Sequence, residues 1–119
     1  MNEHPLVTTL RKKLADSSRP FIIMAELDAQ PGRGDDVAAA VAGTQVIRLT
    51  RLENGCVSYD LYRDLDAPDR FVIYECWRNL AVLAEHLATA HFSAAGAALA
   101  GLLVKTPVFR VLTPAGEQP

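Results

Sequence analysis

The fold is decided by residues 56–77, which read CVSYDLYR, then DLDAPD, then RFVIYECW. Apolar and polar side chains alternate over residues 56–63 and again over residues 70–77, which is the period of a β-strand. The segment between them, residues 64–69, is rich in aspartate and contains a proline, as turns commonly are. Two such strands joined by a short turn predict an antiparallel β-hairpin.

The alternation assigns the side chains of this hairpin to two opposite faces. One face carries a mostly apolar set, namely Val57, Tyr59, Leu61, Phe71, Ile73, Glu75 and Trp77. The other face carries a second set, namely Cys56, Ser58, Asp60, Tyr62, Val72, Tyr74 and Cys76. We expect the first set to face the helices of the domain, and both cysteines to be small buried hydrophobes.

Further strands and helices are predicted on both sides of the hairpin. Strands are expected over residues 21–28 and 106–112, and helices over residues 37–52, 80–87 and 91–103, with Asn79 as an N-cap. The resulting order is strand, helix, strand, strand, helix, strand. With the helices on one face of a four-stranded antiparallel sheet, this order predicts a ferredoxin-like βαββαβ domain of the α+β class.

The two ends of the chain are expected to lie outside this domain, which spans residues 21–113. Residues 1–20 predict a helical arm, in which Leu6, Leu10 and Leu14 form one apolar stripe. The stripe either docks on its own domain or on a partner subunit, or the arm is frayed, as termini often are. Residues 114–119 predict a loose tail.

Composition limits the possible classes of partner. The chain has 119 residues, which suits one domain, and half of them are hydrophobic. Twelve Lys and Arg against 14 Asp and Glu leave a net charge of −2, whereas nucleic acids and anionic membranes require a basic surface. No apolar run reaches the length of a membrane span, no secretory signal is recognisable, and the chain has two cysteines. We therefore expect a cytoplasmic protein with reduced thiols.

The face of the sheet opposite the helices is too apolar to be left in water. It would carry Ile22, Met24, Tyr62, Val72, Tyr74 and Cys76. A two-layer domain with both sheet faces apolar usually buries one of them in an oligomer, so we expect a homodimer through this sheet face.

Three short sequence blocks carry a specific resemblance. The first is Glu53-Asn54-Gly55-Cys56 followed by Tyr59, the second is Glu75-Cys76-Trp77, and the third is His86 followed by His91-Phe92. In this order and spacing they resemble the antibiotic biosynthesis monooxygenase domain family, whose pattern is E-x-G-C…Y, E-x-W and H-x₄-H-F. The resemblance covers residues 21–113 and implies a dimeric α/β barrel, with a cavity between sheet and helices in each subunit.

The resemblance also implies a reaction. It implies oxygenation of a small hydroxylated aromatic of the quinol or phenol type without metal, flavin or haem, with dioxygen as the co-substrate. The substrate loses a proton to a base, and its anion passes an electron to dioxygen. Two other functions stay open, namely isomerisation of a small carbonyl compound by the same base, and a non-catalytic dimeric module for ligand binding or stress response.

Three residues are candidates for catalysis. His86 is the first candidate for the base, because histidine titrates near neutral pH; the alternative is a histidine that only packs. Glu75 lies between apolar neighbours and must find a donor or be protonated. Pairing with Arg110 or with His86 would satisfy it, and in the second case it would also orient His86. The Tyr59 hydroxyl is expected to donate to an oxygen of the substrate.

Four further residues are candidates for binding the substrate. Trp77 offers a broad apolar wall and one N–H donor for a planar ligand, and Phe71 and Ile73 share its strand face. His91 is expected to cap or begin the second helical segment, with a place in the pocket as the lesser alternative. Because His86 and His91 are five residues apart and not four, the sequence predicts no metal site.

Overall fold

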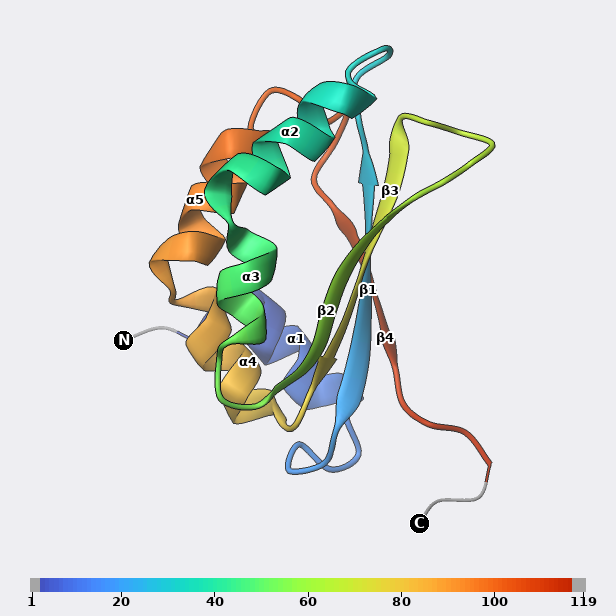
Figure 1. The fold of residues 1–119 in the computed structure, drawn as a ribbon. Helices are drawn as coiled ribbons and strands as arrows, with labels where there is room; N and C mark the ends of the chain where they lie inside the picture. The colour runs from blue at the N-terminus through green and yellow to red at the C-terminus, as the bar shows by residue number, and fades with distance from the viewer. Residues whose placement is uncertain (1–2, 117–119) are drawn as a thin grey trace.

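A four-stranded antiparallel sheet covered on one face by helices makes up residues 3–116, the part of the chain that the computed structural model describes (Figure 1). The strands are β1 (Phe21–Asp28), β2 (Cys56–Arg63), β3 (Arg70–Trp77) and β4 (Val108–Leu112), in the spatial order β2-β3-β1-β4. The helices are α1 (Pro5–Lys13), α2 (Gly34–Thr44), α3 (Val46–Arg51), α4 (Leu80–Leu87) and α5 (Ala90–Leu99). The predicted ferredoxin-like α+β fold is confirmed.

The hairpin of β2 and β3 forms as predicted, except at its open end. Tyr59 lies opposite Glu75, and Leu61 lies opposite Ile73. A β-bulge between Cys56 and Ser58 shifts the register, so that Cys56 lies opposite Trp77 and packs against the core. Val57 is 63% exposed. The predicted faces of Val57 and Cys56 were therefore wrong, because the bulge inserts one extra residue into the alternation.

The helical region between β1 and β2 is two helices and not the single helix predicted over residues 37–52. Gln45 separates α2 from α3 in the left-handed conformation, with φ of 57°. The break lets Val41 and Val46 both turn into the same apolar cluster, in which they pack with Ala95. Burial of the two valines thus offsets the strain of one left-handed residue other than glycine, which costs about 1–3 kcal/mol.

Each of the two helices after the hairpin, α4 and α5, begins at a side chain that caps its first turn. The Asn79 side chain accepts a hydrogen bond from the Val82 amide at the start of α4, as predicted, and Thr89 caps α5 in the same way through the Phe92 amide. The helix predicted over residues 91–103 is shorter in the structure, because α5 ends at Leu99. The strand predicted over residues 106–112 is also shorter, since β4 begins at Val108. Within residues 3–116, no helix is both long and apolar enough to cross a membrane.

The N-terminal arm docks on its own domain. Val7 and Leu10 of α1 are buried in one cluster with Tyr59, Trp77 and Leu83, between the sheet and α4. Leu6 and Leu14 pack against the edge of this cluster. The predicted tail has no helix or strand over residues 114–116, and its last three residues, 117–119, lie outside the described residues.

One face of the sheet carries no helices (Figure 1). The register places the apolar side chains that the alternation predicts on this face, together with the charged Glu26, Asp60 and Arg110. Along β1 the side chains alternate between buried and half-buried, and the half-buried ones point to this open face. Three large apolar side chains on it are strongly exposed in the single chain, namely Tyr62, Val108 and Leu112.

Candidate active site

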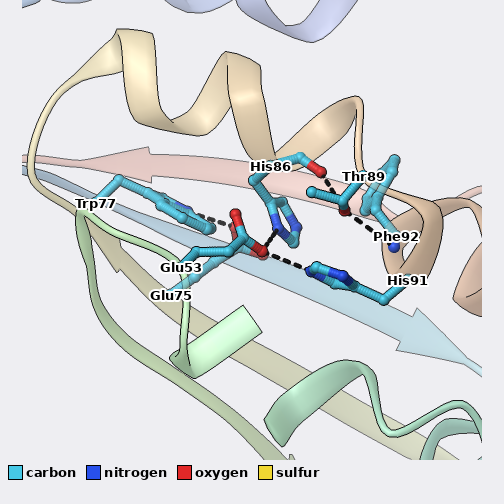
Figure 2. Close-up of polar contacts among 7 residues, drawn as sticks. All are labelled: Glu53, Glu75, Trp77, His86, Thr89, His91 and Phe92. Atoms are coloured by element: carbon cyan, nitrogen blue, oxygen red, sulfur yellow. Dashed lines mark hydrogen bonds and ion pairs between the residues drawn. The ribbon is translucent and has the colours of Figure 1, made fainter. Parts of the chain in front are cut away.

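One carboxylate oxygen lies between two histidine rings, beneath α4 (Figure 2). Glu53 Oε2 lies 2.7 Å from His86 Nδ1 and 2.6 Å from His91 Nε2. A carboxylate oxygen only accepts hydrogen bonds, so both ring nitrogens carry their hydrogen toward it. Glu53 therefore fixes the tautomer of both histidines.

The two histidines meet because a helix ends between them. His86 lies in the last turn of α4, and Thr89 then caps α5, so that His91 projects from a new helix. The Thr89 hydroxyl also donates to the His86 carbonyl over 2.7 Å, which holds this corner. The spacing argument considered only two ligands on one helical face, whereas these histidines lie on two different helices and share Glu53, a residue from a distant loop.

Gly55 allows the loop that carries Glu53 to approach α4. Its φ is +98°, and a Cβ at this position would lie 2.5 Å from Val82 Cγ1. Only glycine accommodates both the left-handed backbone and this contact. The Gly55 carbonyl accepts the Arg78 amide over 2.9 Å, which ties the loop to the end of β3.

His86 is fully buried among aromatic rings. The ring centroids of Trp77, Phe92 and Tyr59 lie 4.7, 5.2 and 5.6 Å from its own. Within residues 3–116, its Nε2 atom has no hydrogen-bond partner. Burial lowers the pKa of His86, and the neighbouring Glu53 offsets only part of that effect. The result is a neutral imidazole with an unpaired nitrogen in an apolar enclosure.

The sequence suggested that Glu75 pairs with His86 or with Arg110. In the structure it pairs with neither. Its carboxylate accepts the Trp77 indole N–H over 2.7 Å, because residues two apart on one strand face are neighbours. Arg110 points to the open face and contacts Glu26. The pKa of Glu75 is raised to about 7, mainly by burial. The indole N–H of Trp77 acts to lower it, and the charge of Glu53 adds to the rise.

Glu75→Gln should make the protein relatively more stable at alkaline pH. The folded state holds the Glu75 proton up to a pKa of about 7, whereas the unfolded chain releases it near 4.5. The free energy of unfolding of the wild type therefore falls through this pH interval, by about 3 kcal/mol. Glutamine keeps the acceptor for Trp77 and removes the ionisation.

The test is chemical denaturation of both proteins at about pH 5 and about pH 8, since the difference between variant and wild type isolates this residue. Glu85→Gln, at an exposed carboxyl on α4, is the matched control. Equal differences at the two pH values would show that Glu75 ionises as freely in the fold as in water.

The remaining predicted site residues divide into two groups. Tyr59 and Trp77 surround His86, and Ile73 packs against the edge of the same cluster. Phe71 does not reach the site: it lies in a separate cluster with Leu27, six residues before Trp77 on β3 and thus about 20 Å away. Its assignment to substrate binding is not supported by its position.

A family comparison agrees with the geometry of this site. The family model described as antibiotic biosynthesis monooxygenase matches residues 20–98, from just before β1 to the last turn of α5. The chain belongs to the antibiotic biosynthesis monooxygenase family. All three sequence blocks of the site lie inside the matched range, whereas α1 and β4 lie outside it.

Two similar proteins are known by sequence, and one of them carries the name of a monooxygenase. A candidate monooxygenase of Mycobacterium tuberculosis, Rv0793, is 36% identical over 98 residues, which cover 82% of this chain and 94% of the relative. The uncharacterized protein sll1783 of Synechocystis is 27% identical over 84 residues, or 71% of this chain. The match spans only 56% of that longer protein.

Solved structures show the same fold. The structure of Rv0793 superposes with a TM-score of 0.73 at 30% identity, over 84% of this chain and 99% of that one. The structure of PA3566 from Pseudomonas aeruginosa gives a TM-score of 0.75 at 26% identity, over 86% and 100% of the two chains.

Glu53 and Phe92 are the site residues to which the sequence alone assigned no role. Glu53 opens the first block of the family pattern, and Phe92 closes the third. That pattern was the signal available for both. No periodicity marks Glu53, because it lies in the loop between α3 and β2.

Proposed function

We propose that the protein is a monooxygenase that oxidises a small hydroxylated aromatic with dioxygen and uses no prosthetic group, with His86 as its base. The observation that carries this proposal is the state of the His86 ring. Its Nδ1 is held by Glu53, and its Nε2 is buried without a partner. A buried polar atom without a partner costs about 1–3 kcal/mol, which a substrate hydroxyl would recover by donating to it.

The proton of the substrate passes from its hydroxyl to His86 Nε2. The ring then carries a positive charge, which the Glu53 carboxylate stabilises from the Nδ1 side over 2.7 Å. This stabilisation acts only after proton transfer, so it favours the ionised substrate over the neutral one. Glu53 is thus a positioning residue that also compensates the charge of the base.

Oxidation follows from the electron-rich anion. The phenolate passes one electron to dioxygen, and the resulting radical and superoxide combine into a peroxide at a ring carbon. His86 returns its proton to the peroxide, and loss of water, which takes the hydrogen of that ring carbon, leaves a quinone. One oxygen atom enters the ring and the other leaves as water, so the substrate supplies all the electrons.

The rings around His86 suit a planar substrate. Trp77 and Tyr59 are buried, whereas Phe92 is half-buried and is the ring able to turn toward solvent. A substrate that reaches Nε2 therefore displaces Phe92 and stacks against Trp77. Burial raises the pKa of Tyr59, so its hydroxyl stays protonated and can donate to the substrate.

Oxygen consumption tests this proposal. A panel of hydroquinones and phenols is supplied to the purified protein in an oxygen-electrode cell, and products formed under ¹⁸O₂ are analysed by mass spectrometry. We expect consumption of dioxygen with one labelled atom in the product. Turnover of a carbonyl compound without oxygen consumption would instead support an isomerase, and binding without turnover would support a ligand-binding module.

We also propose that two copies form a homodimer through the open sheet face. This face carries Ile22, Met24, Val72, Tyr74 and Cys76 together with the exposed Tyr62, Val108 and Leu112. An apolar sheet face of this kind is stable when it packs on a second sheet. The helices and the candidate site lie on the opposite face, so each copy keeps a site of its own.

A further inference from the structure

We propose that Glu53, His86 and His91 also bind a divalent transition cation such as Zn²⁺, and that the bound cation switches off the base. The first half of this proposal concerns binding alone. The second half rests on the proposed function, because it concerns the proton acceptor of that reaction.

The three side chains form a compact donor set. The carboxylate oxygen of Glu53 and one ring nitrogen from each histidine all lie within 4.8 Å of one another. Two imidazole nitrogens and one carboxylate oxygen are a ligand set that Zn²⁺, Co²⁺ and Fe²⁺ accept. Ligand atoms on one such ion lie about 3.0–3.4 Å apart, so the present contacts of 2.6 and 2.7 Å need to open by less than about 1 Å.

The site is open on one side and fixed on the other. The side chains of Glu53 and His91 are each 16% exposed, whereas His86 is not exposed at all. An ion can therefore arrive from the side of Glu53 and His91, and a water molecule can complete its coordination there. The corner at Thr89 holds the His86 carbonyl, so the buried ligand is already in place.

Cation binding moves a proton within His86. In the free protein Nδ1 carries the hydrogen and points it at Glu53, which leaves a lone pair on Nε2. A cation takes the lone pair of Nδ1, so the single hydrogen of the neutral ring moves to Nε2. Nε2 then donates and can no longer accept the substrate proton. The ring keeps its one hydrogen, so this exchange releases no proton from His86.

Binding is tested on untagged protein freed of metal with a chelator. Zn²⁺ is titrated in a calorimeter, and Co²⁺ is titrated in a spectrophotometer to follow its visible d–d absorption. We expect one ion per chain, and a loss of affinity of about 100-fold or more in His91→Ala. His4→Ala removes the third histidine of the chain, which caps α1, and should bind like the wild type.

The two halves of the proposal fail separately. Binding that is absent in the wild type, or that is unchanged in His91→Ala, would overturn the metal site whether or not the protein is an enzyme. Stoichiometric binding that leaves oxygen consumption unchanged would overturn the switch. If both halves hold, one equivalent of Zn²⁺ abolishes oxygen consumption and a chelator restores it. Circular dichroism of each variant shows whether the fold is retained.

Discussion

His86→Gln should lower the rate of oxygen consumption by about 10²–10⁴-fold, the usual contribution of a general base. Glutamine is preferred to alanine because the ring is fully buried, and alanine would leave a cavity. The variant keeps a polar side chain near Glu53 but offers no nitrogen that accepts a proton near neutral pH. In the wild type, the rate should rise with pH through a pKa below that of a free histidine, because burial lowers it. This rise should disappear in the variant.

His91→Gln is the matched control, because it changes the other histidine that contacts Glu53 and leaves the proposed base in place. His91 contacts the same carboxylate oxygen but does not have a buried unpaired nitrogen. We expect the His91→Gln variant to keep most of the wild-type rate of oxygen consumption, in contrast to His86→Gln. If His86→Gln is as active as the wild type, His86 is not the base. Glu75 is then the next candidate, because its pKa of about 7 also suits proton transfer. Loss of the folded state, measured by thermal unfolding, would instead give His86 a purely structural role.

Tyr74→Glu should convert the proposed homodimer into monomers. Tyr74 lies on the open face opposite Met24 on β1 and Asp60 on β2, near the middle of the sheet. A glutamate there would be buried without a partner between two sheets, at a cost of several kcal/mol. That cost corresponds to a dimer dissociation constant about 100-fold or more higher.

The oligomeric state is measured by light scattering and by sedimentation over a range of micromolar concentrations. Leu65→Glu is the matched control, because Leu65 lies in the β2–β3 turn and is 99% exposed. It introduces the same charge and should leave the dimer intact. A monomeric wild type, or a dimeric Tyr74→Glu variant, would show that the open face is not the interface.

The layers of the fold could be predicted because they depend on repeating patterns. Alternation in β2 and β3 and the Asn79 cap depend on neighbours in sequence, and the structure confirms them. The bulge at Cys56 and the left-handed Gln45 depend on distant residues instead. Each lets a particular side chain reach a cluster that no local pattern describes.

The candidate site was predictable only in part, for a similar reason. His86 and Trp77 lie on apolar faces whose period is visible in the sequence, so their direction could be inferred. Glu53 acquires its role only from the two rings that α4 and α5 bring to it. Arg110, the expected partner of Glu75, is directed away from Glu75 by the register of β4 against β1.

The docking of α1 has a consequence for the order in which the protein assembles. Its nine residues leave the ribosome well before Tyr59, Trp77 and Leu83, the residues with which Val7 and Leu10 pack. A helix shorter than about 12 residues is not stable alone in water. α1 therefore becomes helical only when β3 and α4 are already in place. Interactions that form after the transition state for folding change the rate of unfolding more than the rate of folding, so we expect α1 to act mainly by slowing the unfolding of the finished domain.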